Sequence, residues 1–370
     1  MYAIVVLIII QTAILTVFVV QSIRQRKYGQ NIVQEEFKPL GGDIDVIIAS
    51  RESFEMTCGC LDSVLSSGMN NIILCMDGGD KSVTQRIIVK YPTVHVLYNE
   101  KPLGKIKSQI KCLKTSKSQD VLVLDADIRL IPKQIPDFIA CFSSGKADFL
   151  CPYSLGNYQN NISFLSKIEE TDRYMRQRIV RAGRDAYGVS NLSGYCMLAN
   201  RKKYIEIVDS EATQDDVIAT MNLLQKGYVV RTYHHVVCSE IERNSFVSYL
   251  LQKTRWTAGN IKLIASYPKL FRVTDKRKAL AFSSSFLLWY WALWIDCIAM
   301  ALCPFFRVIA VLLAIEFTIK YTGLVAASRP NSRLGYNLAY LFVWPVFSMI
   351  CLMLTPYYLT GKINEQKTRR

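Results

Sequence analysis

Leu122-Val123-Leu124-Asp125-Ala126-Asp127 is an apolar run that ends in two carboxylates, two residues apart. A short run of branched aliphatic residues is typical of a buried β-strand, so both aspartates fall where this strand ends. Once the strand has stopped alternating, this spacing can direct both carboxylates towards one ligand. An Asp-x-Asp tripeptide by itself is common and equally typical of a solvated loop, so its meaning depends on the rest of the chain.

Short apolar runs and helical stretches alternate on the N-terminal side of this strand. Strands are expected at 45–49, 71–76, 94–98 and 121–124, with helices at 56–67, 83–91 and 105–116. This alternation predicts an α/β domain with a mostly parallel sheet and helices on both of its faces. Ligands bind beyond the carboxyl ends of the strands in such sheets, which is where Glu52, Asp77 and the two aspartates fall.

The pattern is less regular after Asp127. It resumes at Asn191-Leu192-Ser193-Gly194-Tyr195-Cys196 and at Thr213-Gln214-Asp215-Asp216, which opens a helix that runs to Lys226-Gly227. An aspartate near a helix start is also ordinary capping chemistry, so Asp215 alone would be interpreted as a cap.

The composition indicates a chain that is partly soluble and partly embedded in a membrane. With 51% hydrophobic and 20% charged residues among 370, it is too apolar for an ordinary soluble protein and too charged for a purely membrane one. This predicts one soluble domain, residues 43–256, together with several spanning segments. Residues 1–21 have no basic start and no small-residue cleavage site, which favours an uncleaved spanning helix over a signal peptide. Residues 22–42, with Pro39 and Gly41-Gly42, are typical of a linker.

The C-terminal third is expected to meet the membrane. Residues 257–280 mix apolar and basic side chains, which predicts an amphipathic segment on the membrane surface. Residues 281–360 then hold three apolar runs, at about 281–303, 305–327 and 336–360, each long enough to span a bilayer. A basic tail, residues 361–370, ends the chain.

Basic residues beside the apolar runs predict the orientation. They place the N-terminus outside and residues 43–256 in the cytoplasm, as in an integral protein of the plasma (inner) membrane. Three C-terminal spans would leave the basic tail outside, against the positive-inside preference. Either that preference is overridden, or one run is re-entrant or interfacial.

The net charge of +15 and the eleven cysteines exclude some functions. Much of the charge flanks the apolar runs, and no basic stripe with interleaved aromatic residues is present, so we expect no nucleic-acid partner. The cysteine positions fit neither a disulfide framework nor a zinc site, which favours reduced cysteines used as small apolar residues.

Gln252-Lys253-Thr254-Arg255-Trp256 is a QxxRW pentapeptide that lies just before the amphipathic segment and the apolar runs. For Arg255 and Trp256 alone, an anchor at the lipid headgroups is the alternative. However, the chain has an Asp-x-Asp, then this pentapeptide, then the apolar runs. With its motifs in this order, it resembles the membrane-embedded family 2 glycosyltransferases, which include cellulose, chitin and hyaluronan synthases. The resemblance covers roughly residues 40–260 and implies a GT-A type, Rossmann-like domain with transmembrane helices.

The resemblance implies a role for each candidate residue on the donor side. Asp77 would bind the uridine of a UDP-sugar, and Lys105 would approach the nucleotide, although a solvated lysine at a helix start is the alternative. Asp125 would contact the nucleotide sugar, and Asp127, together with Asp125, would hold Mg²⁺ or Mn²⁺ on the diphosphate.

The acceptor side follows from the same resemblance. Asp216 would be the general base, with Asp215 in the position where the family usually has a glutamate. Arg255 would help to hold the departing diphosphate, and Trp256, with Gln252 beside it, would form the floor on which the acceptor sugar stacks. The segment around Gly194 resembles one that lies near the acceptor terminus in chitin and hyaluronan synthases.

These roles describe an inverting transfer from a UDP-sugar to a growing β-linked polysaccharide or oligosaccharide. The partners would be the UDP-sugar donor, a saccharide or lipid acceptor and membrane lipids. Two alternatives stay open: a single transfer to a lipid such as ceramide or diacylglycerol, and a non-catalytic membrane scaffold.

Three charged residues fall inside the apolar runs. Asp296, Glu316 and Lys320 are functional candidates because charge in lipid is costly. Glu316 and Lys320 are four residues apart and can neutralise each other on a helix, whereas Asp296 has no such neighbour in the sequence.

Overall fold

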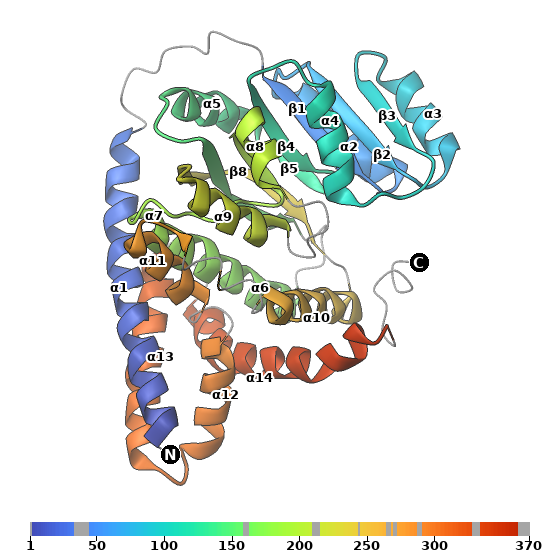
Figure 1. Cartoon of the computed structure of the whole chain (residues 1–370). Helices are drawn as coiled ribbons and strands as arrows, with labels where there is room; N and C mark the ends of the chain where they lie inside the picture. The colour runs from blue at the N-terminus through green and yellow to red at the C-terminus, as the bar shows by residue number, and fades with distance from the viewer. Residues whose placement is uncertain are drawn as a thin grey trace. The chain divides into compact units, whose positions relative to one another are not determined.

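The computed structural model describes residues 2–32, 44–157, 163–208, 215–242, 245–263, 268, 272–286, 291–327 and 334–361. The chain divides into two compact units (Figure 1). The sheet unit comprises Gly29–Asn157 and Ser190–Ile241. The helical unit comprises Met1–Tyr28, Tyr158–Val189 and Glu242–Arg370. Residues 22–32 of the predicted linker belong to the first helix, and residues 33–42 lie outside the described residues, as does nearly all of the predicted basic tail.

The sheet unit is built on one mixed sheet with the strand order β3-β2-β1-β4-β7-β6-β8-β5 in the described residues. The strands are β1 (Asp45–Ser50), β2 (Ile72–Asp77), β3 (His95–Asn99), β4 (Asp120–Asp125), β5 (Ile128–Leu130), β6 (Phe149–Asn157), β7 (Cys196–Asn200) and β8 (Val230–Ile241). Strands β3, β2, β1 and β4 are parallel, as the sequence predicts. Beyond them, β7 and β5 run antiparallel to their neighbours, so the α/β fold is confirmed with a mixed sheet.

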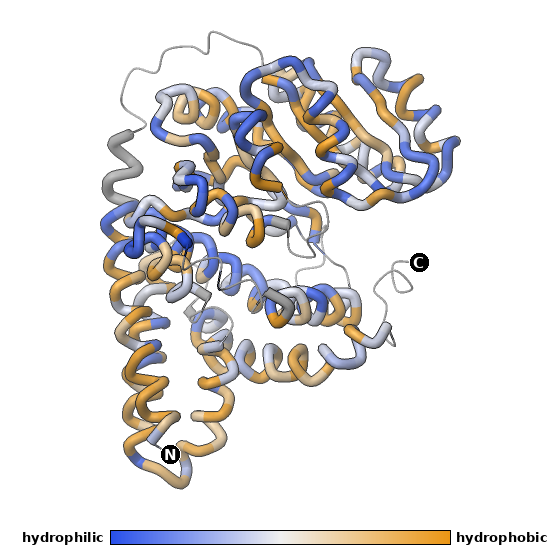
Figure 2. Tube along the Cα trace, viewed as in Figure 1, coloured by the Kyte–Doolittle hydropathy of each residue, from blue (hydrophilic) through white to orange (hydrophobic). Residues whose placement is uncertain are grey.

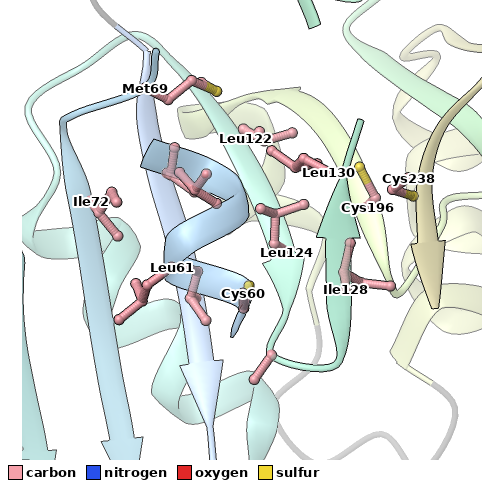
Figure 3. Close-up of a cluster of buried hydrophobic side chains, with 14 of the residues drawn as sticks. Cys60, Leu61, Met69, Ile72, Leu122, Leu124, Ile128, Leu130, Cys196 and Cys238 are labelled. Carbon is pink, nitrogen blue, oxygen red and sulfur yellow. The ribbon is translucent and has the colours of Figure 1, made fainter. Parts of the chain in front are cut away.

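Helices cover this sheet and bury its apolar residues. They are α2 (Phe54–Leu65), α3 (Lys81–Lys90), α4 (Lys105–Thr115), α5 (Ile135–Ser143), α8 (Arg201–Ile207) and α9 (Asp215–Lys226), with a short 3₁₀ turn, η1 (Pro132–Gln134). Figure 3 shows Leu61 of α2 among Ile72 of β2, Leu122 and Leu124 of β4, and Ile128 of β5. Each such buried aliphatic side chain contributes about 1.5–3 kcal/mol to folding.

The N-terminal helices begin and end within two residues of the predicted bounds. Ser53 caps α2 by accepting a hydrogen bond from the Met56 amide, and Asp80 caps α3 in the same way. Helix α4 begins after Gly104, whose φ of +93° lies in the left-handed region that favours glycine.

The helical unit holds α1 (Tyr2–Ile32) as far as Tyr28, α6 (Phe164–Tyr174), the π-helical η2 (Met175–Arg181), α7 (Ala182–Asp185), α10 (Phe246–Leu263), α11 (Lys276–Phe286), α12 (Ala292–Leu302), α13 (Arg307–Ala327) and α14 (Leu334–Leu359). Figure 2 shows apolar residues along α1 and α13. Among the described residues, Tyr2–Gln25, Arg307–Ala327 and Gly335–Leu359 are long and apolar enough to cross a membrane. The expected span at 281–303 is described only in part, as segments of α11 and α12, because residues 287–290 lie outside the described residues.

Helix α1 packs tightly into the helical unit through two glycines. A Cβ on Gly183 of α7 would lie 3.0 Å from the Phe18 Cα, and one on Gly323 of α13 would lie 2.9 Å from a Val19 methyl. Phe18 and Val19 belong to the buried apolar core of this unit. Glycine at these positions therefore lets α1 approach α7 and α13 closely, whereas any side chain there would increase the distance between the helices.

A buried polar cluster joins α1, α12 and α13. The Gln11 side-chain amide donates to Asp296 Oδ1 at 2.7 Å and to Glu316 Oε2 at 2.6 Å. The Lys320 ammonium contacts the same two carboxylates, and Asp296 and Glu316 have no exposed surface. Asp296 thus finds its counter-ion on the next helix, a pairing that no local sequence spacing could reveal.

Candidate active site

Asp77 ends β2 and holds the loop that leads into α4. Its Oδ1 accepts hydrogen bonds from the Leu103 amide at 2.8 Å and from the Asn99 side chain at 2.9 Å. Its Oδ2 accepts from the Gly104 amide at 2.9 Å. Burial raises the pKa of this carboxyl, but the hydrogen bonds outweigh burial, and the net pKa lies below its ordinary value. Asp77 is therefore an anion fixed at the carboxyl edge of the sheet, beside the start of α4.

Lys105, the first residue of α4, binds the first aspartate of the Asp-x-Asp. Its ammonium lies 2.8 Å from Asp125 Oδ1 and 2.9 Å from Oδ2, and it donates to the Gly194 carbonyl at 2.7 Å. The pair is only partly exposed, with about a third of the Lys105 side chain and a quarter of the Asp125 side chain accessible. Lys105 thus joins α4, the end of β4 and the segment before β7.

Asp216 comes to the same place from the start of α9. A Cβ on Gly194 would lie 3.6 Å from the Lys105 ammonium and 3.9 Å from the Asp216 carboxyl carbon. The Thr220 hydroxyl ties this segment to α9, because it accepts from the Leu192 amide and donates to the Asp216 carbonyl. The structure therefore gathers Lys105, Asp125 and Asp216 around Gly194. For Asp215 only the backbone is described, and Thr213 and Gln214 lie outside the described residues.

Asp127 lies in a concentration of negative charge. Burial, and then the carboxylates of Asp125, Glu240 and Glu52, raise the pKa of the Asp127 carboxyl to about 8, against the lowering effect of the Lys105 ammonium. Glu240 reaches the site because it pairs with Ile128 across the β5–β8 ladder, where the Ile241 amide donates to the Asp127 carbonyl. Nothing in the local sequence around Glu240 indicates that it lies beside the Asp-x-Asp.

These oxygen ligands fit a hard divalent cation. Among the described residues, no three side chains of histidine, cysteine, aspartate or glutamate converge into a complete metal site. Mg²⁺ commonly binds through one or two carboxylates and completes its shell with substrate phosphates and water. The excess of carboxylates around Asp127 is suited to that kind of site.

Arg129 supports the turn that carries both aspartates, a role that the sequence did not indicate. Its guanidinium donates to the Ala126 carbonyl at 3.2 Å, the Ile128 carbonyl at 2.8 Å and the Met56 carbonyl of α2 at 3.0 Å. A Cβ on Gly59 of α2 would lie 2.5 Å from this guanidinium, so glycine makes room for it. Arg129 therefore ties the turn to α2.

The QxxRW residues lie on α10 in the helical unit, whereas Asp77, Asp125, Asp127 and Asp216 belong to the sheet unit. Gln252 is buried, Trp256 is partly buried and Arg255 is exposed. Trp256 meets two cations: the Lys253 ammonium lies 3.9 Å from its ring centroid, and the Arg176 guanidinium of η2 lies 5.4 Å away. Contacts of this kind hold an indole in one orientation.

Lys253, the second residue of the pentapeptide, is buried among rings and a carboxylate. Its ammonium lies 5.0 Å from the Tyr249 centroid and 3.5 Å from Glu169 Oε1 of α6. Burial, with a contribution from Arg176, lowers the pKa of Lys253 to about 8. The sequence alone indicates no role for Lys253, because Glu169 and Arg176, which lie near its ammonium, are far from it in the sequence.

The segment after the Asp-x-Asp is more regular than predicted. Ser163 caps a helix that continues through α6, η2 and α7 to Asp185. Many of its polar residues are buried, among them Glu169, Asp172 and Arg173. A helix whose buried face carries charges lacks the apolar stripe that reveals a helix in sequence, which explains why it was missed.

The similarity to known proteins concerns the family and the fold. A family model described as glycosyl transferase family group 2 matches residues 121–359. No curated protein matches the chain. Among solved structures, the chain is similar to the mannosyltransferase PcManGT from Pyrobaculum calidifontis in complex with GDP-Man and Mn²⁺, with a TM-score of 0.58 and 12% identity. The match covers 95% of this chain and 99% of that one, and at this identity it concerns the fold.

Proposed function

The chain belongs to glycosyl transferase family group 2, and from that membership we propose a membrane-integrated, inverting enzyme that extends a β-linked saccharide from a UDP-sugar. The observation that carries the proposal is the gathering of Lys105, Asp125 and Asp216 around Gly194. These side chains supply a cation for a diphosphate, a carboxylate for the donor and a carboxylate that can accept a proton.

The donor would lie against the carboxyl edge of the sheet. Asp77 would accept hydrogen bonds from the uracil or ribose. The Leu103 and Gly104 amides hold its carboxylate in place, and the carboxylate oxygens can accept further hydrogen bonds. As the donor binds, Lys105 would give up part of its contact with Asp125 and would bind the diphosphate instead. Asp125 would then be available to the nucleotide sugar.

Asp127 and Asp125 would hold Mg²⁺ or Mn²⁺, which supplies Lewis-acid stabilisation of the leaving diphosphate. The similarly folded mannosyltransferase forms its complex with GDP-Man and Mn²⁺, which supports this combination of donor class and metal. Glu52 and Glu240 add negative charge nearby and would favour a cation there.

Asp216 would remove the proton from the acceptor hydroxyl as that oxygen attacks the anomeric carbon. One displacement of this kind inverts an α-linked donor to a β-linked product and requires no covalent enzyme intermediate. Gly194 would leave room for the acceptor beside Asp216, because a side chain there would occupy the space between Asp216 and Lys105. Asp215 would be the auxiliary carboxylate of the pair.

The α10 residues would serve the acceptor and the leaving group. Trp256, held by Lys253 and Arg176, would present an indole face to the acceptor sugar, and the exposed Arg255 would bind the diphosphate. Gln252 would orient an acceptor hydroxyl. The contact of α10 with the apolar α14 favours a second candidate, a lipid acceptor, because a lipid hydroxyl would reach this helix from the bilayer.

Donor and acceptor class can be tested together with the purified full-length protein in native lipid. Radiolabel would be followed from UDP-glucose, UDP-N-acetylglucosamine, UDP-glucuronate and GDP-mannose with Mg²⁺ or Mn²⁺, and products separated by size and organic extraction. A large aqueous product from a UDP-sugar is expected, lost in Asp127→Asn and kept in Asp80→Asn, which changes an exposed helix cap. Label in the organic phase would establish the lipid alternative. Turnover of GDP-mannose alone would contradict the uridine assignment of Asp77.

A further inference from the structure

We infer that α14 lies along the membrane surface, with one face on lipid, and leaves the C-terminus on the same side of the membrane as Arg24. Length and composition alone would make α14 a spanning helix, since Gly335–Leu359 is long and apolar enough to cross. Contacts within the helical unit favour the surface position instead, and they are independent of which sugar is transferred.

The direction of α14 differs from that of the other long apolar helices. Helices α1 and α13 lie side by side, as the approach of Gly323 to Val19 shows, and α14 runs across them (Figure 1). The turn between α12 and α13 lies near the N-terminal end of α1 (Figure 1). A bilayer crossed by α1 and α13 would therefore have α14 closer to its plane than to its normal.

One face of α14 packs on helices that carry buried charge. Tyr340 donates to Asp172 of α6, and Phe347 stacks on Tyr249 of α10 with centroids 5.5 Å apart. Trp344, between them, stacks on both Tyr340 and Phe347. Helices α6 and α10 also contain the buried Glu169–Lys253 ion pair. Five of the eleven residues of α6 are charged, too many for a helix in hydrocarbon, so α6 belongs at the membrane surface, and α14 follows α6 and α10 over this length.

The opposite face of α14 is an exposed apolar stripe. Its members are Leu338, Phe342, Val346, Ile350, Met353 and Tyr357, each between 41 and 66% exposed. Their spacing of three or four residues places them on one side of the helix. A stripe of this length, continuous with the apolar helices α12 and α13, fits the boundary between lipid headgroups and acyl chains.

Charge placement supports the same arrangement. Arg178 of η2 donates to the Ala327 carbonyl at 2.9 Å, so α13 ends beside the surface helices and α14 begins on that side. A helix that lies in the surface keeps Gly361, the last described residue, on the side of Arg24. The sequence after it contains Lys362, Lys367, Arg369 and Arg370, which the positive-inside preference favours on that side. A crossing α14 would place all four on the other side.

The inference can be tested by membrane depth in the full-length protein in lipid nanodiscs. A spin-labelled amino acid would replace Leu338, Val346 or Met353 in turn, which leaves the native cysteines untouched. We expect the three depths to agree within a few ångströms. A crossing helix would separate the first from the last by roughly 22 Å, at about 1.5 Å per residue, and that result would overturn the inference.

A reporter at the C-terminus gives a second readout in cells. Green fluorescent protein fused after Arg370 is expected to fluoresce, and alkaline phosphatase fused there is expected to be inactive, as for any cytoplasmic end. The matched control is the same phosphatase inserted at Phe305, in the turn between α12 and α13, where it is expected to be active. Active phosphatase at both positions would contradict the proposed orientation.

Discussion

Lys105 is the side chain on which the candidate active site depends most directly. It contacts both oxygens of Asp125 and the Gly194 carbonyl, so it neutralises a carboxylate that would otherwise repel a diphosphate. Lys105→Ala is expected to raise the donor KM about tenfold, the cost of one charge-assisted hydrogen bond, with a smaller change in kcat. Steady-state kinetics checks this, with the exposed Lys101→Ala as control. An unchanged donor KM would remove Lys105 from the site.

Lys253 predicts a pH dependence of stability. Its pKa is about 8 in the folded chain and 10.5 in the reference state, so above pH 8 the unfolded chain binds more protons. Because of Lys253, the free energy of unfolding therefore rises with pH between about 8 and 10.5, by at most roughly 1.4 kcal/mol per pH unit. Below pH 8 both states are protonated and the slope vanishes.

The measurement is thermal unfolding of the wild type and of Lys253→Met across this pH range. The wild type is expected to gain stability relative to the variant as pH rises above 8, because only the wild type loses a buried charge. Parallel curves for the two proteins would mean that Lys253 is not a buried cation.

Arg129 and Gly59 are expected to act together in holding the turn that carries the two aspartates. Gly59→Ala places a Cβ where the guanidinium lies, so the bonds to the Ala126 and Met56 carbonyls are expected to break at a cost of about 1–3 kcal/mol. Arg129→Met removes the same bonds. The double variant is therefore expected to be little worse than either single one in unfolding free energy and in Mn²⁺ affinity. Additive losses would show that the two residues act separately.

At the scale of elements, the glycine contacts of α1 determine how the helical unit closes. Gly323→Ala is expected to lower the unfolding temperature, because its methyl would lie 2.9 Å from Val19. Val19→Ala in the same chain is expected to restore part of the loss by providing room. Gly335→Ala is the control, since a Cβ there meets nothing within 4 Å. If Gly323→Ala and Gly335→Ala changed the unfolding temperature equally, the close approach of α13 to α1 would be disproved.

The elements also show what the sequence could and could not predict. The parallel strands β1 to β4 and their helices were predictable, because their apolar runs alternate with helical ones. The helix formed by α6, η2 and α7 was missed, since its buried face carries Glu169, Asp172 and Arg173. The expected span at 281–303 is described only in part, because residues 287–290 between α11 and α12 lie outside the described residues.

Long-range partners limited the prediction of the site in the same way. Asp77, Asp125 and Asp216 could be proposed as candidates from strand ends and motif order, because sequence shows where a strand ends and where a helix begins. Glu240 and Arg129 could not, because each reaches the Asp-x-Asp through a partner on another element. Asp296 likewise finds Lys320 and Gln11 across helices.

At the scale of the whole molecule, the residues with proposed roles are found in both units. The carboxylates and Lys105 lie in the sheet unit, and Trp256 and Arg255 lie in the helical unit on α10, which packs against apolar α14. This division fits an enzyme that takes a soluble nucleotide sugar and an acceptor associated with the membrane. Family membership supports the transfer itself, and the identity of donor and acceptor is the proposal.

The most direct test of the central claim is the kinetics of Asp216→Asn, which keeps the shape of the side chain and removes its basicity. We predict that kcat falls by about 10²–10⁴, as for loss of a general base, with the donor KM changed by less than about threefold. Asp80→Asn should retain full activity. If Asp216→Asn turns over like the wild type, Asp216 is not the base and the site around Gly194 is not the catalytic centre.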